Sequence, residues 1–190
     1  MKTLIWNGSP RKNGDTAFLV HELARQLRGD VKILDVYSRG IAPCVDCRYC
    51  CREPGCSQKD GMQSVYREIA ACDAVVIASP IYFSELTGPL LSAASRLQMF
   101  YAARRFLHCE LLPKKKKGAI ILCGGGDGSA EIAKTTAETL LAEMNAECVG
   151  FVASLNTDAI SSRSDAQARR GIREMAALLN AERGGAQKNG

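Results

Sequence analysis

The chain has 190 residues, of which 46% are hydrophobic and 24% charged, and its formal net charge is +5. This length and composition predict one globular domain, and they exclude disordered, collagen-like and coiled-coil proteins. The densest cationic run, residues 114–117, directly precedes an apolar stretch, so the charge does not indicate a nucleic-acid partner. No apolar run approaches the roughly 20 residues that cross a bilayer, and the first one meets a turn too early for a signal peptide. We therefore expect a cytoplasmic protein with no membrane partner.

Short β-branched and apolar runs alternate along the chain with longer segments of helical period. The expected strands are Thr3–Asn7, Val31–Val36, Ala74–Ser79, Ala119–Cys123 and Cys148–Val152. The expected helices have as their apolar faces Phe18, Leu19, Leu23 and Leu27; Met62, Val65, Tyr66 and Ile69; Leu90, Leu91, Ala94 and Leu97; Ile132, Thr136, Leu140 and Met144; and Ile172, Met175, Ala176 and Leu179. This alternation predicts an α/β fold with a doubly wound, five-stranded parallel sheet in one domain, residues 1–182. Residues 183–190 have little apolar surface and are expected to form a flexible tail.

The loop after the first expected strand combines small residues, hydroxyls and two cations, and it leads into a helix. It reads Gly8-Ser9-Pro10-Arg11-Lys12-Asn13-Gly14-Asp15-Thr16. Ligands of open parallel sheets bind outside the carboxyl ends of the strands, and free N–H groups at a helix start favour a phosphate. The loop lacks both the Walker A motif and Gly-x-Gly-x-x-Gly. The alternative is a polar turn in which Asp15 or Thr16 caps the helix.

Two further loops at the same expected sheet edge are unusual. Ser79-Pro80-Ile81-Tyr82-Phe83-Ser84-Glu85 places an aromatic pair at a strand end, where a planar heterocycle could rest against the main chain. Cys123-Gly124-Gly125-Gly126-Asp127-Gly128-Ser129 allows a ligand to approach the backbone closely. Each loop also has a purely structural alternative, because the aromatic side chains could fold into the core and the glycines could form only a tight turn.

Five of the nine cysteines lie between Cys44 and Cys56. Intervals of two, two and five residues place Cys44, Cys47, Cys50 and Cys56 on one compact loop, and a [4Fe-4S] cluster needs four converging thiolates. Cys51 is then not required. A tetrahedral zinc site and free or redox-active thiols are the other interpretations, and the spacing alone does not decide between the three.

Three segments together resemble the NADPH-dependent FMN reductase family and its iron–sulfur flavoprotein relatives. They are the loop 8–16, Cys44-x-x-Cys47-x-x-Cys50 ahead of Cys56 and Asp60-Gly61-Met62, and the segment 73–83. The resemblance covers about residues 1–155. It implies a flavodoxin-like sheet of order 2-1-3-4-5, non-covalently bound FMN and a homodimer or homotetramer.

The resemblance also implies which residues contact FMN. Ser9, Arg11, Asn13 and Thr16 would bind the phosphate, with Lys12 and Asp15 in the same loop; Pro80, Ile81, Tyr82 and Phe83 would line the isoalloxazine ring; and Gly124, Gly125 and Asp127 would close its other side. One stretch departs from the family's Gly-x-x-Lys-x-x-x-Asp-Arg pattern. Leu91 and Ser95 replace its Lys and Asp, whereas Arg96 remains.

The leading functional hypothesis is an FMN-dependent oxidoreductase that takes hydride from NAD(P)H and passes electrons to a small acceptor such as a quinone, a flavin or a nitro compound. No catalytic acid or base is required. The alternative is an iron–sulfur flavoprotein that moves single electrons between FMN, a [4Fe-4S] cluster held by Cys44, Cys47, Cys50 and Cys56, and a partner such as ferredoxin. A thiol-based redox sensor or zinc module is a third hypothesis, in which the flavin loops have no role.

Overall fold

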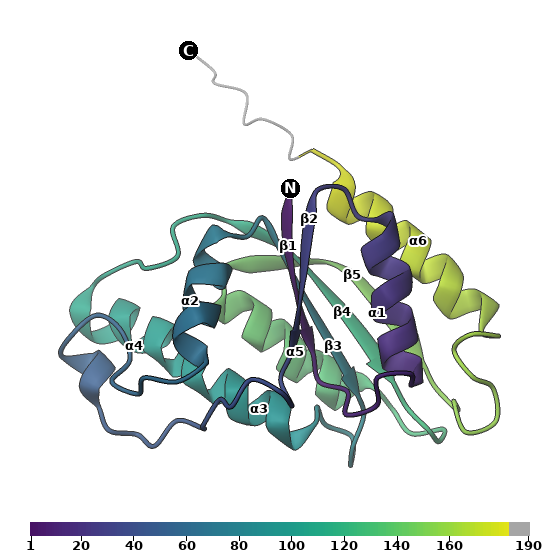
Figure 1. Ribbon diagram of the computed structural model, residues 1–190, viewed down its shortest axis with the longest axis horizontal. Coiled ribbons are helices and arrows are strands. Elements are labelled where there is room, and N and C mark those ends of the chain that lie inside the picture. Colours follow the sequence, from purple (N-terminus) through teal and green to yellow (C-terminus); the bar gives the residue numbers. More distant parts are fainter. Residues whose placement is uncertain (183–190) are drawn as a thin grey trace.

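Five parallel strands form one sheet in the computed structural model, which describes residues 1–182 (Figure 1). The strands are β1 (Lys2–Asn7), β2 (Asp30–Asp35), β3 (Ala74–Pro80), β4 (Lys116–Cys123) and β5 (Ala146–Ser154). Their order is β2-β1-β3-β4-β5, and all four pairings are parallel. The predicted doubly wound sheet of order 2-1-3-4-5 is therefore confirmed. The tail expected at residues 183–190 lies outside the described residues.

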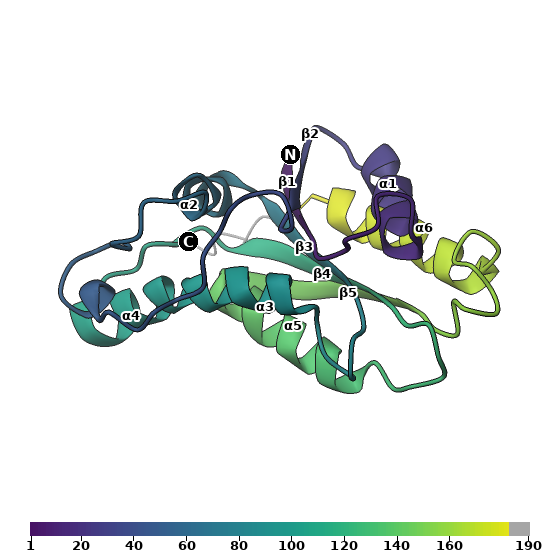
Figure 2. The ribbon, with the colours of Figure 1, turned by 60° about the horizontal axis from the view of Figure 1, so that its bottom comes forward.

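Helices cover both faces of the sheet (Figure 2). One face packs against α1 (Asp15–Gln26) and α6 (Ala166–Asn180). The other packs against α2 (Met62–Ala71), α3 (Gly88–Ala94), α4 (Gln98–Leu107) and α5 (Glu131–Glu143). Two short 3-10 turns, Tyr49–Cys51 and Ser95–Leu97, complete the described elements. No helix within residues 1–182 is long and apolar enough to span a membrane.

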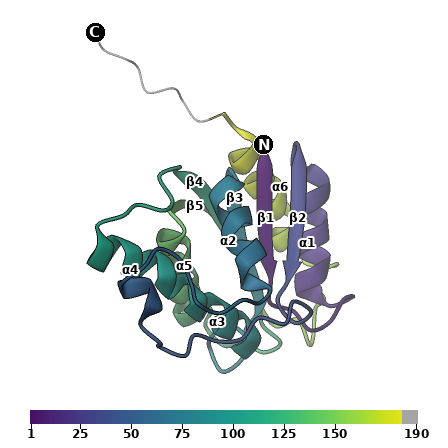
Figure 3. The same ribbon diagram turned by 60° about the vertical axis from the view of Figure 1, so that its left-hand side comes forward.

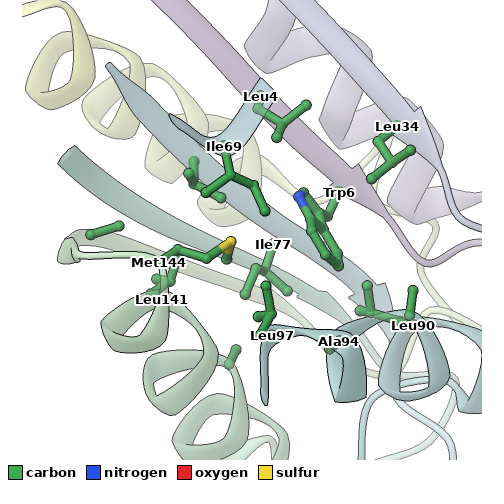
Figure 4. Packing of buried hydrophobic residues seen from close by; sticks show 14 of the residues in the cluster. Leu4, Trp6, Leu34, Ile69, Ile77, Leu90, Ala94, Leu97, Leu141 and Met144 are labelled. Carbon is green, nitrogen blue, oxygen red and sulfur yellow. The ribbon is translucent and has the colours of Figure 1, made fainter. Parts of the chain in front are cut away.

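The central strands are buried on both faces, which explains their continuous apolar sequences. Trp6 and Ile77 face the core beneath α2 to α5, whereas Ile5 and Val76 face α1 and α6. Figure 4 shows Trp6 among Leu4, Leu34, Ile77 and Leu90. Because alternate side chains enter two different cores, the sheet holds the carboxyl ends of its strands in a fixed register.

The apolar face predicted for α5 is confirmed toward its carboxyl end, where Met144 is buried and Leu140 packs against the core, but it is wrong at the start. Ile132, which was expected to point inward, is 60% exposed, while Ala133 and Ala137 are fully buried. The physical reason is close packing: a Cβ atom added to Gly118 of β4 would lie 2.8 Å from Leu141 Cδ1. Small side chains let α5 approach the strand, so they face the sheet in place of the larger Ile132.

The sequence analysis did not predict α4. Its residues Met99 and Phe100 are both buried. Phe100 packs edge-to-face on Tyr66 of α2, with ring centroids 5.5 Å apart. The short helix α3 therefore continues through a 3-10 turn into a second helix that covers the same core.

Candidate functional site

The loop after β1 is held tightly against the sheet at Gly8. The Gly8 N–H donates to the Ala78 carbonyl at 2.7 Å, and Thr87 Oγ1 donates to the Gly8 carbonyl at 2.9 Å. A Cβ atom at Gly8 would lie 3.0 Å from both Leu90 Cδ2 and Thr87 Oγ1. A larger residue would push the loop away from β3 and α3, so glycine is required here by close approach.

The amino terminus of α1 has no side-chain cap. Gly14 occupies the capping position, so the expectation that Asp15 or Thr16 caps this helix is wrong. The carboxylate of Asp15 instead accepts hydrogen bonds from Ser161 Oγ at 2.8 Å and from the Ser162 N–H at 2.6 Å. The first N–H groups of α1 thus stay available to an anion, at the positive end of the helix dipole.

A cavity of about 260 Å³ lies at the carboxyl ends of β1, β3 and β4, and we call it the sheet-edge cavity. Its lining includes these predicted cofactor residues: Ser9, Arg11, Asp15, Thr16, Pro80, Ile81, Tyr82 and Gly125. The other predicted residues, Lys12, Asn13, Phe83, Gly124 and Asp127, belong to the same loops but do not line it. The structure therefore brings residues from all three predicted loops together in one cavity.

The loop after β5 also contributes to this cavity, through Thr157 and Asp158, which the sequence analysis missed. Its N–H groups at Thr157 and Asp158 donate to the carbonyls of Gly124 and Gly125, at 2.9 and 3.1 Å. A Cβ atom at Gly125 would lie 2.7 Å from Asp158 Oδ2, so a larger residue there would displace the Asp158 carboxylate. The signal was present in the sequence, because the end of a fifth parallel strand reaches the same edge of the sheet.

The aromatic pair after β3 lies on a tight reverse turn beside the cavity. Tyr82 and Glu85 exchange two backbone hydrogen bonds of 2.9 and 3.0 Å around it. The central residues Phe83 and Ser84 have φ angles of 52° and 64°, the left-handed region typical of a type I′ turn. Tyr82 is 45% exposed and Phe83 fully exposed, so the alternative that these rings enter the core is wrong.

The five clustered cysteines line a second cavity of about 200 Å³, which we call the cysteine cavity. It lies between residues 44–58 and α4, where the blue segment of Figure 3 passes around α3 and α4, and it shares no lining residue with the sheet-edge cavity. Besides Cys44, Cys47, Cys50, Cys51 and Cys56, its lining includes Tyr49, Met99, Tyr101 and Phe106. The predicted cluster ligands are thus neighbours. Within residues 1–182, however, no three His, Cys, Asp or Glu side chains are gathered closely enough to hold a metal ion.

The thiols of this cavity have different electrostatic surroundings. Burial raises the pKa of Cys50, and the neighbouring thiols of Cys51, Cys44 and Cys56 raise it further. A hydrogen bond between Cys47 Sγ and Ser57 Oγ, 3.2 Å apart, lowers the pKa of the exposed Cys47 thiol.

A buried cation adjoins the cysteine cavity. The side chain of Arg96 is fully buried, and its Nη1 lies 2.7 Å from Asp60 Oδ2. Its Nη2 donates to Cys56 Sγ at 3.2 Å. Burial works against ionisation of Asp60, but the Arg96 hydrogen bond and two backbone N–H groups hold its pKa below the usual value. The ion pair therefore stays charged at neutral pH and presents a donor to one sulfur of the cavity.

Comparison with known proteins identifies the family. The model of the NADPH-dependent FMN reductase family matches residues 1–159. The chain belongs to this family. As a member of the NADPH-dependent FMN reductase family, it is a flavodoxin-like oxidoreductase, and the resemblance based on its three loops is confirmed.

Its curated relatives within the family include iron–sulfur flavoproteins. One from Methanocaldococcus jannaschii is 32% identical over 144 residues, which cover 72% of this chain and 68% of the relative. Another, from Archaeoglobus fulgidus, is 27% identical over 136 residues, covering 70% of this chain and 59% of the relative. This chain therefore spans less than two thirds of the Archaeoglobus protein.

Solved structures share the fold at low sequence identity. An NAD(P)H:quinone oxidoreductase from Methanothermobacter marburgensis superposes with a TM-score of 0.76 at 13% identity, covering 97% of this chain and 99% of that one. An FMN-dependent NADH-azoreductase from Bacillus anthracis, solved with FMN, has a TM-score of 0.68 at 15% identity, covering 95% and 100% of the two chains. At these identities the likeness establishes the flavodoxin-like fold.

Proposed function

We propose that the sheet-edge cavity binds FMN, with the phosphate against the start of α1. The observation that carries this assignment is the uncapped helix: its first N–H groups have no side-chain acceptor, and Ser9, Arg11 and Thr16 line the cavity beside them. Backbone N–H groups, hydroxyls and a guanidinium all donate to phosphate oxygens. Asp15 is compatible with a phosphate because its Oδ1 is already bonded by the loop after β5.

The remaining walls of the cavity suit a planar ring. Pro80, Ile81 and Tyr82 from one loop and Gly125 from another supply apolar surface and accessible main chain. Bound FMN would supply the redox chemistry, accepting hydride from NAD(P)H. Hydride transfer to a flavin requires position and a shielded face rather than a protein acid or base. The contribution of the protein is therefore to bind the flavin, orient it and shield one side.

For the onward path of the electrons, we propose the iron–sulfur flavoprotein function. Its support is the cysteine cavity, in which four thiols at the predicted spacing adjoin the buried guanidinium of Arg96. The donor types suit an iron–sulfur cluster, because thiolates are its ligands and an N–H donor stabilises their negative charge. The thiols line one cavity but would have to draw closer together than they lie in the described residues to bind the iron. Cys44, Cys47, Cys50 and Cys56 would hold it. A bound cluster passes electrons singly, which suits a protein partner such as ferredoxin.

A second candidate function is direct reduction of a small acceptor by the flavin. It is favoured by the exposed hairpin of Tyr82 and Phe83 beside the sheet-edge cavity. Aromatic side chains held outside the core offer a stacking surface for a planar quinone, flavin or nitro compound. In this case the cysteines would remain thiols.

Anaerobic purification tests the two candidates together. The iron–sulfur function predicts FMN with about four iron and four sulfide per chain. Cys47→Ser should lose the iron and retain FMN, because the two cavities share no residue. Cys148→Ser is the matched control, since Cys148 is an exposed thiol on β5 outside both cavities. Flavin without iron that is bleached by NADH or NADPH would favour the second candidate, and a chain that takes up no FMN would overturn both.

A further inference from the structure

Arg96 is the one arginine of the described chain whose side chain is fully buried beside the cysteine cavity. It lies in the 3-10 turn between α3 and α4, and the segment that carries the cysteines wraps around this turn (Figures 1 and 3). A buried guanidinium needs several acceptors to offset its desolvation, and this one finds them on a single loop. Arg96 therefore does not act as a surface charge, and its role has to be sought in the loop that it contacts.

The guanidinium joins both ends of the cysteine segment. Its Nη1 donates to the Ala42 carbonyl at 3.0 Å and to Asp60 Oδ2 at 2.7 Å. Its Nη2 donates to Cys56 Sγ at 3.2 Å and to the Gln58 carbonyl at 3.4 Å. The segment from 42 to 60 is therefore closed into a loop by one side chain, and its fourth predicted ligand is held directly by that side chain.

Two features of Arg96 make this contact more than a loop anchor. One acceptor, besides the Gln58 carbonyl and the Asp60 carboxylate, is the sulfur of Cys56, and the donor is a buried cation. Hydrogen bonds to ligand sulfurs and nearby charge are among the features that set the reduction potential of an iron–sulfur cluster. A cluster becomes more negative on reduction, so a buried cation that donates to one of its sulfurs stabilises the reduced form.

We propose that Arg96 is a positioning residue that holds Cys56 for the cluster and raises the reduction potential of that cluster. This inference rests on the proposed iron–sulfur function. Asp60 acts one step further away: it orients the guanidinium and stabilises its charge but does not touch a cysteine sulfur in any hydrogen bond of the described structure.

The test compares two variants of the full chain that differ only at residue 96. Asp60→Asn removes the carboxylate and leaves Arg96 on Cys56, whereas the double variant Arg96→Gln/Asp60→Asn also removes the cation. The double variant avoids leaving the Asp60 carboxylate without its cation, and in Asp60→Asn the guanidinium keeps the Ala42 and Gln58 carbonyls as acceptors. Each protein is purified anaerobically, and its iron, its FMN content and the midpoint potential of the iron–sulfur signal are measured.

Relative to Asp60→Asn, we expect the double variant to have an equilibrium constant for one-electron reduction of the cluster about tenfold lower, a shift of about 59 mV to more negative potential. Its FMN content should not change, since Arg96 does not line the sheet-edge cavity. Arg96→Lys in place of Arg96→Gln in the double variant keeps a positive charge, so its midpoint potential should lie between those of the other two variants. Loss of iron from the double variant alone, with FMN retained, would also support the inference.

Two results would overturn the inference in distinguishable ways. Equal potentials in the two variants, or iron lost from both, would reduce Arg96 to a loop anchor while leaving the iron–sulfur function intact. A wild-type chain that binds FMN but no iron would remove the proposed iron–sulfur function itself, and the role of Arg96 with it.

Discussion

Asp15 and Ser161 are 146 positions apart in the chain, yet Ser161 Oγ donates to Asp15 Oδ1 at 2.8 Å. The same carboxylate oxygen accepts from the Ser162 N–H at 2.6 Å. The bond joins the start of α1 to the loop after β5, and both of these segments line the sheet-edge cavity. The Asp15 carboxylate therefore holds the two segments that line the cavity together, because it accepts hydrogen bonds from the loop after β5.

Asp15→Ala should loosen this closure. We expect the free energy of unfolding to fall by about 1–3 kcal/mol, because a partly buried backbone N–H and a hydroxyl lose a charged acceptor. Asp15→Asn retains an acceptor oxygen and should cost less. Urea unfolding of the apoprotein measures both, and an unchanged midpoint for Asp15→Ala would show that the bond contributes nothing.

Arg11→Ala and Thr16→Ala should lower the affinity for FMN more than the affinity for riboflavin, because riboflavin lacks the phosphate. Loss of a charge-assisted hydrogen bond is worth about 1.5–3 kcal/mol, so roughly a 10- to 100-fold weaker FMN affinity is expected for Arg11→Ala. Lys12→Ala is the matched control, since Lys12 is a cation of the same loop that does not line the cavity. Equal losses of FMN and riboflavin affinity would contradict the phosphate assignment.

Gly125→Ala should also lower the affinity for FMN, and a second substitution should restore part of that affinity. The new Cβ would lie 2.7 Å from Asp158 Oδ2, so the Asp158 carboxylate has to turn aside within the cavity that both residues line. Removing the obstacle with Asp158→Ala should restore part of the affinity, because residues in contact are not additive. Fluorescence titration of FMN into the four proteins of this cycle gives the coupling, and strictly additive losses would count against a steric cause.

Substitutions in the exposed hairpin should affect the free energy of unfolding and the rate of flavin reduction differently. Phe83 has a φ of 52°, a conformation that costs roughly 1–2 kcal/mol for a residue with a Cβ atom. Phe83→Gly relieves this strain, so stability should stay level or rise by up to about 1 kcal/mol after the entropic cost of glycine. Loss of the ring should slow reduction of bound FMN by NAD(P)H. Ser84→Gly relieves strain at the neighbouring residue and keeps the ring, and it should leave that rate unchanged.

Asp60 makes the stability of the chain sensitive to acid. Its folded pKa is lowered, so its contribution is complete at pH values above the ordinary aspartate pKa and is lost as the pH falls through the folded value. The free energy of unfolding should therefore drop more steeply below about pH 4 in the wild type than in Asp60→Asn. Parallel curves for the two proteins would show that the Arg96 pair does not persist in solution.

Much of the fold and part of the site could be predicted from the sequence because they depend on local patterns. The apolar runs around Ile5 and Val76 specify buried parallel strands, and parallel strands bring their loops to one edge. Ser9, Arg11 and Tyr82 followed from that rule. Ile132 was misplaced because the inner face of α5 begins one residue later, at Ala133 and Ala137, and continues to Leu141, which packs against Gly118.

The contact between Arg96 and Cys56 could not be predicted from the sequence. It joins residues 40 positions apart, and one of them lies in a loop without regular structure. The spacing of the cysteines indicated a shared loop, and it carried no information on what would be buried beside that loop. The loop after β5 could be placed at this edge from the sequence, but the hydrogen bonds that tie Thr157 and Asp158 to the glycines after β4 are seen only in the structure.

The most direct test of two separate redox sites in one chain is a crystal structure of anaerobically purified protein with anomalous scattering at the iron edge. We predict flavin density in the sheet-edge cavity, with its phosphate at the N–H groups that begin α1. We also predict one compact iron peak in the cysteine cavity, bonded by Cys44, Cys47, Cys50 and Cys56. Flavin bound elsewhere, or a cysteine cavity without an iron peak beside an occupied flavin site, would contradict this account.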